Sequence, residues 1–213
     1  FQARDRYLQE RCPETLVLTY AMHWPNRQRE TARNLRRSPL HHAMKAQGAC
    51  FGEVQGWERP LYFGKVGTSP EIDYSFGRQS WFDKALAEQL AARQKVAMID
   101  YSMLGKLLVK GPDALSFLQR LCTNNIDMRV GSIVYSLMLN EDGGVESDVT
   151  IARHTEDSFM MMCSIVHTRR VYIHLCDNLR RGESIDVQDV TTSQAVIAIM
   201  GPKSRAVIQT VTD

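Results

Sequence analysis

The 213-residue chain contains no apolar run near the ~20 residues that a membrane-spanning helix needs, and no signal-peptide pattern. It also lacks a Gly-x-Gly-x-x-Gly or Walker A loop, so no nucleotide-binding fold can be inferred from it. His-Glu-x-x-His, paired Cys/His spacings and Gly-x-Ser-x-Gly are missing too, which excludes the common zinc sites and the serine nucleophile turn. Chemistry must therefore come from dispersed carboxylates, aromatic side chains and backbone groups, and we expect no metal and no membrane partner.

Net charge and cysteine content are low as well. The formal charge of +2 is too small to predict a nucleic-acid partner. The five cysteines are an odd number, widely spaced and without a Cys-x-x-Cys pair, which favours a reducing compartment over a disulfide framework. With 44% hydrophobic and 23% charged residues, the chain has ordinary globular composition and enough length for one large core or two smaller ones.

Neither end of the chain resembles the end of a protein. Phe1 opens a charged amphipathic stretch, and Asp213 closely follows a helix-like segment that begins near Pro202. We interpret the chain as an internal fragment of a longer protein.

The amino-terminal third predicts short elements separated by basic and turn-forming residues. Residues 1–11 have helical composition that Pro13 should stop, and the β-branched, apolar residues 15–20 predict a strand. A basic polar segment follows. The other expected features are a helix over 40–47 between Ser38-Pro39 and Gly48, a turn at 57–60 and a loop over 64–77.

Beyond a domain boundary that we place near Phe63, the pattern becomes more regular. Residues 133–140 and 145–153 predict a hairpin around the Gly-containing segment 141–144. Strands and helices mix without strict βαβ alternation, which favours an α+β fold over a doubly wound sheet. The remaining expected elements are helices over 81–97, from 113 onward, over 167–179 and after Gly201-Pro202, and strands over 106–110, 158–165, 184–190 and 195–200.

One residue of the hairpin is unusual for its position. Asp148 precedes the β-branched run Val149, Thr150, Ile151, although aspartate is depleted in strands. A carboxylate that faces a cleft would account for it. The alternative is that Asp148 points to solvent or caps the turn, which is the commoner role for a lone strand aspartate.

The hairpin resembles a known signature. Residues 138–148, MLNEDGGVESD, are similar to the signature of glycine-cleavage T-proteins, whose final aspartate lies against the reactive nitrogens of folate and is essential for one-carbon transfer. By position this residue is Asp148, and Tyr135 matches a tyrosine that lines the folate site. The second acidic residue that the family often has is Ser147 here. Leu104 stands where a methionine contacts the pterin, and Ser164 stands where an asparagine binds it.

Two upstream segments narrow the resemblance. Arg-Arg-Ser-Pro-Leu at 36–40 and Gln-Gly-Trp-Glu-Arg-Pro at 55–60 resemble the central segment that joins the flavin and folate domains in the sarcosine and dimethylglycine dehydrogenase family, a sarcosine dehydrogenase-like member being favoured. The resemblance implies an aminomethyltransferase-like α+β folate-binding domain, incomplete at residues 64–213. A flavin-oxidoreductase central segment, residues 1–63, would precede it.

The resemblance also implies an activity for the full-length protein. A covalently held FAD, bound upstream of this chain, takes a hydride from the N-methyl group of sarcosine or dimethylglycine. Tetrahydrofolate then captures the one-carbon unit beside Asp148, with Tyr135, Leu104 and Ser164 as cofactor-binding positions. The chain alone should be inactive. The implied partner is a small N-methylated amine, and the compartment would be the mitochondrial matrix in a eukaryote or the cytoplasm in a bacterium.

Three other interpretations remain. A non-catalytic protein like the pyruvate dehydrogenase phosphatase regulatory subunit fits Ser164 in place of asparagine, whereas the retained Tyr135 and Asp148 argue against it. A stand-alone aminomethyltransferase of the glycine cleavage system is disfavoured by the segment at 57–60. A purely structural module is the third, because one fold hosts unrelated functions. A flavin-linking histidine upstream would separate the enzyme from the regulatory protein.

Overall fold

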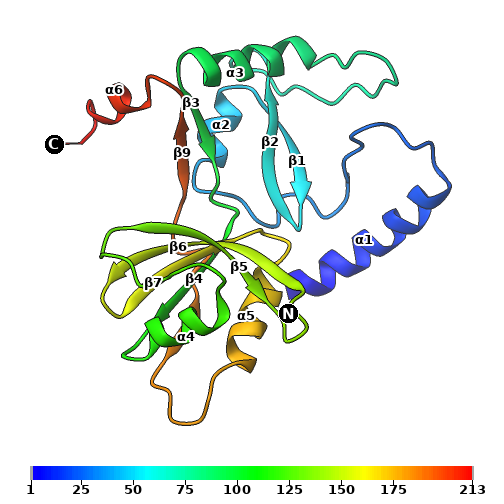
Figure 1. Ribbon diagram of the computed structural model, residues 1–213. Helices are drawn as coiled ribbons and strands as arrows, with labels where there is room; N and C mark the ends of the chain where they lie inside the picture. The colour runs from blue at the N-terminus through cyan, green and yellow to red at the C-terminus, as the bar shows by residue number, and fades with distance from the viewer. Residues whose placement is uncertain (1, 213) are drawn as a thin grey trace. The chain divides into compact units, whose positions relative to one another are not determined.

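The computed structural model describes the backbone of residues 2–212 and the side chains of residues 5–212. The chain forms two compact units. Unit 1 contains the residues up to Asp100 together with those from Ile197 onward, and unit 2 contains Tyr101–Val196. Helices and strands are mixed in both (Figure 1), so the predicted α+β class is confirmed. The boundary near Phe63 stays a prediction.

In unit 1, the first helix continues where the sequence predicted a stop and a strand. α1 spans Gln2–Tyr20 with Pro13 inside it, so the predicted strand over 15–20 is wrong. Proline has a helix-compatible φ and removes only one N–H, and tertiary contacts offset that loss. The Glu10 carboxylate accepts the Ala32 N–H at 2.8 Å, and the Glu14 carboxylate accepts the Glu30 N–H at 2.6 Å. These contacts bind the middle of α1, on both sides of Pro13, to the basic segment, so tertiary contacts rather than local helix propensity decide the structure here.

The second helix forms close to the predicted position. α2 spans His41–Ala46, and the Ser38 hydroxyl accepts the Leu40 N–H at 3.2 Å just before it begins. Gly48 follows with φ +83°, and a Cβ at this position would collide with the carbonyl oxygen of Lys65. The glycine therefore ends the helix and also permits the close approach of the loop.

A β-hairpin replaces the turn that was predicted at 57–60. β1 (Ala49–Val54) pairs antiparallel with β2 (Trp57–Phe63), and the turn lies two residues earlier, at Gln55 and Gly56. Both turn residues have positive φ, as the tight hairpin turn that matches strand twist requires. Pro60, which suggested a turn, is tolerated because it pairs with Phe51 beside a register shift.

The rest of unit 1 includes a pairing between distant segments. The loop at 64–77 and the helix α3 (Phe82–Gln94) are confirmed. β3 (Ala97–Asp100) was not anticipated, and it pairs antiparallel with β9 (Ile197–Met200), almost a hundred residues away in the chain. α6 (Ser204–Ile208) follows Gly201-Pro202 as expected.

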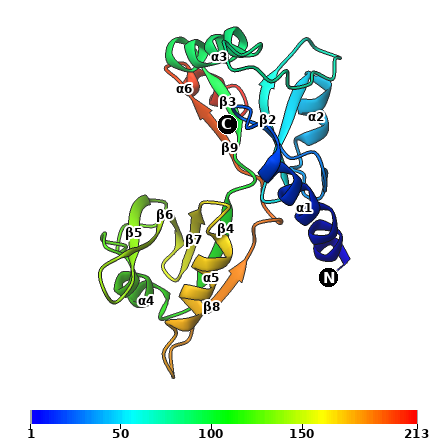
Figure 2. The ribbon, with the colours of Figure 1, turned by 90° about the vertical axis from the view of Figure 1, so that its right-hand side faces the viewer.

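Unit 2 is built on a five-stranded antiparallel sheet in the order β5-β6-β7-β4-β8 (Figure 2). The predicted hairpin is confirmed as β5 (Ile133–Leu139) and β6 (Val145–Thr155). The other elements also lie close to their predicted positions: β4 (Gly105–Lys110), α4 (Ala114–Leu121), β7 (Ser158–Cys163), α5 (Thr168–Asp177) and β8 (Asp186–Asp189).

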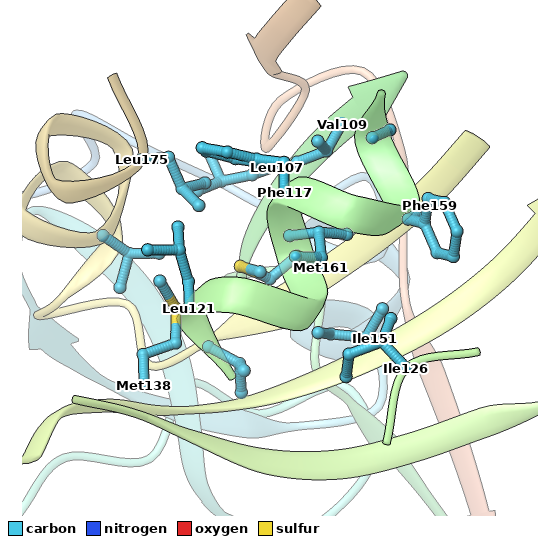
Figure 3. Close-up of a cluster of buried hydrophobic side chains, with 14 of the residues drawn as sticks. Leu107, Val109, Phe117, Leu121, Ile126, Met138, Ile151, Phe159, Met161 and Leu175 are labelled. Carbon is cyan, nitrogen blue, oxygen red and sulfur yellow. The ribbon is translucent and has the colours of Figure 1, made fainter. Parts of the chain in front are cut away.

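The hydrophobic core covers one face of this sheet. Side chains of α4 and α5 pack against alternate residues of the strands, and Phe117, Leu107 and Leu175 are fully buried among them (Figure 3). Because side chains alternate along a strand, the residues between these core positions point to the opposite side. We call that side the open face; it is formed in β5 and β6 by Ile133, Tyr135, Leu137, Asp148 and Thr150.

Candidate functional site

Asp148 and Tyr135 lie together on the open face. In β6 the two neighbours of Asp148, Ser147 and Val149, are buried on the core side, so the intervening carboxylate points outward and is exposed. Asp148 pairs with Leu137 of β5, and the hydroxyl of Tyr135, two residues earlier on β5, donates to Asp148 Oδ2 at 3.4 Å. Tyr135 remains 59% exposed, which leaves most of its ring available for contact.

The role of turn cap belongs to another residue. Asn140 Oδ1 accepts the N–H groups of Asp142 and Gly144, at 3.1 and 2.7 Å. Of the two commonplace roles considered for Asp148, capping the hairpin turn is therefore excluded. Solvent exposure on the open face is what the structure displays.

The sheet register brings Ser164 and Leu104 to the same end of the sheet. Cys163, the last residue of β7, pairs with Val149 of β6 and with Gly105 of β4. One position further along each strand are Ser164, Asp148 and Leu104. The four predicted site residues therefore fall on four adjacent strands or their immediate ends.

Ser164 and Leu104 each belong to a turn. The Ser164 carbonyl accepts the His167 N–H at 3.0 Å and the Thr168 hydroxyl at 3.3 Å, which opens the turn into α5. The Leu104 N–H donates to the Tyr101 carbonyl at 2.9 Å and closes the turn before β4. Both residues are half-buried, so each offers part of its side chain to the surface.

Nearby ionisable groups are already engaged or protonated. Arg170 binds Glu146 at 2.7 Å, and this hydrogen bond lowers the pKa of Glu146. Burial raises the pKa of the Cys163 thiol, and also that of Cys122, to about 11. Neither thiol is therefore a thiolate nucleophile near neutral pH, and Asp148 is the site's exposed carboxylate.

Sequence reasoning missed two residues that support the site. Lys106 is buried, and its Nζ donates to the carbonyls of Ser102 and Leu104 at 2.8 and 2.9 Å. Asn124 Nδ2 donates to the Tyr135 carbonyl at 2.9 Å along the outer edge of β5. No sequence signal separates this lysine and this asparagine from ordinary surface residues.

No group of three or more His, Cys, Asp or Glu residues in the described part of the chain is placed to hold a metal ion. Within residues 2–212, no helix is both long enough and apolar enough to cross a membrane.

Residues 40–213 match the family described as the GCVT N-terminal domain. The chain belongs to this family. Residues 1–38 match the FAD dependent oxidoreductase central domain. The expected combination of a flavin-oxidoreductase central segment and a T-protein-like domain is thereby confirmed.

Among the relatives of this GCVT-family chain is the 4-methylaminobutanoate oxidase (formaldehyde-forming) of Paenarthrobacter nicotinovorans, 44% identical over 97% of the chain and 25% of that protein. The mitochondrial pyruvate dehydrogenase phosphatase regulatory subunit of Mus musculus is 34% identical over 95% of the chain and 24% of that protein. Human mitochondrial sarcosine dehydrogenase is 29% identical over 98% of the chain and 27% of that protein. The chain thus spans about a quarter of the length of these relatives.

The fold agrees with the family assignment. The glycine cleavage system aminomethyltransferase T of Bartonella henselae superposes with a TM-score of 0.64 at 24% identity, over 82% of this chain and 43% of that chain. The predicted aminomethyltransferase-like fold is confirmed.

Proposed function

We propose that this chain is the folate-handling part of an FAD-dependent enzyme that demethylates an N-methyl amino acid. The observation that carries the proposal is the pairing of an exposed tyrosine ring with an exposed carboxylate, Tyr135 and Asp148, on the open face. The match of residues 1–38 to a flavin-oxidoreductase domain and the names of two relatives, an oxidase and a dehydrogenase of methylated amines, support it.

The open face suits tetrahydrofolate. A reduced pterin is flat and apolar on its faces and carries amine groups at its edge. Tyr135 and Leu137 offer an aromatic and an aliphatic surface, and the adjacent Asp148 offers hydrogen-bond acceptors and a negative charge. Leu104 and Ser164 would border the ring at the ends of β4 and β7.

FAD would be held by another part of a longer protein. Residues 2–212 contain no Gly-x-Gly-x-x-Gly motif of the kind that binds dinucleotide phosphates. When bound, the flavin supplies the two-electron oxidation of the N-methyl group, and tetrahydrofolate supplies the amine nitrogens that take up the carbon.

Asp148 and Tyr135 would act by position and charge. A carboxylate beside the acceptor amines orients them by accepting hydrogen bonds from their N–H groups. Its negative charge also stabilises the positive charge that develops during transfer. The Tyr135 hydroxyl, which donates to Asp148, restrains that carboxylate, while its ring provides a packing surface. Holding the acceptor close to the incoming carbon makes up much of the rate gain in such a transfer.

The substrate class follows from the relatives. Sarcosine and dimethylglycine were the amines implied by the sequence motifs, and sarcosine stays the favoured prediction. The 44% identity to a 4-methylaminobutanoate oxidase supports widening the class to N-methyl amino acids with longer chains. In a eukaryote the compartment would be the mitochondrial matrix; the names of the human and mouse relatives describe those proteins as mitochondrial.

A second candidate is a non-catalytic regulatory protein. It is favoured by the 34% identity to the phosphatase regulatory subunit and by Ser164 at the position of the asparagine that binds the pterin in T-proteins. The paired Tyr135 and Asp148 favour the enzyme.

The test uses the full-length protein that contains this chain, with its flavin, and compares wild type with Asp148→Asn. Flavin reduction by sarcosine, dimethylglycine or 4-methylaminobutanoate is followed by absorbance, and methylenetetrahydrofolate and free formaldehyde are quantified. We expect normal flavin reduction in the variant and a fall of about 10²-fold or more in methylenetetrahydrofolate, with formaldehyde rising in its place.

The matched control is Asp142→Asn, an exposed aspartate in the turn of the same hairpin, which should change neither reaction. Equal methylenetetrahydrofolate yields from wild type and Asp148→Asn would remove Asp148 from the mechanism. If none of the methylated amines reduced the flavin of the wild-type protein, the regulatory candidate would be favoured.

A further inference from the structure

Lys106 occupies an uncommon position for a lysine. It is the second residue of β4, is 1% exposed, and has one of the largest side chains among the fully buried residues of the described chain. Lysine is almost never fully buried unless its charge is compensated, because removing an ammonium from water costs several kcal/mol. The buried ammonium group of Lys106 therefore needs polar partners that offset this cost.

The Lys106 backbone is fixed on the side of β8. Its N–H donates to the Thr191 hydroxyl at 3.1 Å, and its carbonyl accepts the Val190 N–H at 2.9 Å. These two hydrogen bonds hold the Lys106 backbone in the sheet, so the position of its Cα and the direction in which its side chain leaves the strand are fixed.

The ammonium group binds the turn that precedes β4. Nζ donates to the Ser102 carbonyl at 2.8 Å and to the Leu104 carbonyl at 2.9 Å. The same turn is closed by the hydrogen bond from the Leu104 N–H to the Tyr101 carbonyl, and the Ser102 hydroxyl accepts the Val196 N–H at 3.2 Å. Because charge-assisted hydrogen bonds hold two of its carbonyls, the 101–104 turn has little freedom to change conformation.

The turn determines where Leu104 lies. Gly105, the next residue, allows close packing: a Cβ there would collide with the Thr168 hydroxyl and lie 2.8 Å from Cys163 Sγ. Strand β4 therefore packs closely against β7 and the start of α5, and Leu104, the last residue of the turn, lies one position beyond the pair formed by Gly105 and Cys163, as Ser164 does on β7. The backbone of residues 101–104 is the link between Lys106 and the candidate folate site.

We propose that Lys106 is a positioning residue: its ammonium group fixes the 101–104 turn so that Leu104 forms one wall of the folate site. This inference rests on the proposed function. With 1% of its surface exposed, Lys106 cannot reach a substrate as a base or nucleophile, so its effect passes through Leu104. Lys110, on the same strand, is exposed and pairs with Asp186 at 3.5 Å, and it has no contact of this kind with the turn.

The experiment is a double-mutant cycle on the flavin-containing full-length protein. The dissociation constant of 5-formyltetrahydrofolate, a stable folate probe, is measured by calorimetry for wild type, Lys106→Met, Leu104→Ala and the double variant. Lys106→Gln, which retains two N–H donors, provides a milder change in case the methionine variant does not fold. Lys110→Met is the matched control. Hydrogen exchange of the backbone amides at 101–105 is recorded for each variant without folate.

We expect Lys106→Met to raise the folate dissociation constant about tenfold and to speed amide exchange in the 101–105 turn. Lys106→Gln should have an intermediate effect, and Lys110→Met should have none. The double variant should bind folate no more weakly than the weaker of the two single variants, because both changes act on the same wall. A purely structural lysine would lower stability but would give additive effects on folate binding.

The outcomes separate this inference from the proposed function. Unchanged exchange at 101–105 in the Lys106 variants would overturn the positioning role whether or not folate binds. Additive effects of Lys106→Met and Leu104→Ala would overturn the route through Leu104. Faster exchange in a protein whose wild type does not bind folate would refute the folate site, and with it the pocket role of Lys106, while leaving the effect on the turn established.

Discussion

Ser147 and Asp148 are neighbours in the chain and face opposite sides of one sheet. Ser147 is 2% exposed and lies on the core side, whereas Asp148 is exposed on the open face. An acidic residue at 147, which related T-proteins often carry, would therefore enter the core side in this chain. The serine fits that place, and its hydroxyl donates to the Asp148 carbonyl at 3.1 Å.

The variant Ser147→Asp should destabilise the protein without adding a carboxylate to the open face. Burying a charge with no counterion should lower the free energy of unfolding by about 2–4 kcal/mol, measured by denaturant titration. Ser147→Ala, which removes only one hydroxyl, should cost about 1 kcal/mol. Tighter folate binding by the aspartate variant would show that residue 147 does reach the site, against the observed alternation.

Tyr135 should contribute mainly through its ring. Tyr135→Phe keeps the ring and loses only the 3.4 Å contact with Asp148, so the folate dissociation constant should change less than about threefold. Tyr135→Ala removes the packing surface and should raise the folate dissociation constant about tenfold. Equilibrium binding of 5-formyltetrahydrofolate measures both. If phenylalanine proved as damaging as alanine, the hydroxyl would be the important group.

A buried ion pair in unit 1 predicts acid sensitivity. Burial raises the pKa of Glu58, but hydrogen bonds from Arg33 at 2.5 and 2.9 Å and from the Asn34 N–H at 2.6 Å outweigh burial, so this pKa lies below its ordinary value. A carboxylate with a lowered pKa stabilises the fold fully above its unfolded pKa, about 4.3. That contribution disappears as the pH falls through the lower, folded value.

In Glu58→Gln, the free energy of unfolding should therefore fall less steeply than in wild type as the pH is lowered below about 4.3. It should also lower the free energy of unfolding at pH 7 by about 3 kcal/mol or more, because Arg33 loses its partner. Thermal melts across this pH range measure both effects. Glu30→Gln, at an exposed position on the adjoining segment, is the control that should change neither. If Glu58→Gln lost stability with falling pH as steeply as wild type does, other carboxylates would be responsible for the pH dependence.

The thiol of Cys163 should react slowly. It is buried, and its pKa of about 11 leaves less than about 0.1% thiolate at pH 7.5, against several per cent for an ordinary cysteine. Iodoacetamide labelling followed by peptide mass spectrometry should modify Cys163 in denaturant and hardly at all in the native protein. Fast native labelling would mean that β7 opens locally, next to Ser164.

The sequence predicted most of unit 2 because its elements are locally consistent. In the hairpin β5–β6, apolar residues flank a Gly-Gly turn and alternate with polar residues along β6, and α4 repeats its apolar residues at helical spacing. These patterns depend on neighbours a few residues apart. The exposure of Asp148 follows from the same alternation, since one register places Ser147, Val149 and Ile151 together in the core.

Unit 1 was predicted less well because distant contacts decide it. The β-branched residues after Pro13 remain helical while Glu10 and Glu14 bind the segment at 30–32, and Pro60 stays in a strand because it sits beside a register shift. β3 exists because it pairs with β9, at the other end of the chain. Hydrogen bonds between remote segments leave no local periodicity for a sequence pattern to display.

By itself, the sequence determined that this chain carries a T-protein-like α+β domain with Asp148 and Tyr135 on one hairpin. The structure places them on the same side, because a register shift between Met138 and Leu139 pairs Asp148 with Leu137, two residues after Tyr135. Only the tertiary structure decided that Leu104 and Ser164 join them at the end of the sheet, and that Lys106 is buried beneath the turn. Those placements depend on the register of β4, β6 and β7, which is set by packing against α4 and α5 rather than by any local signal.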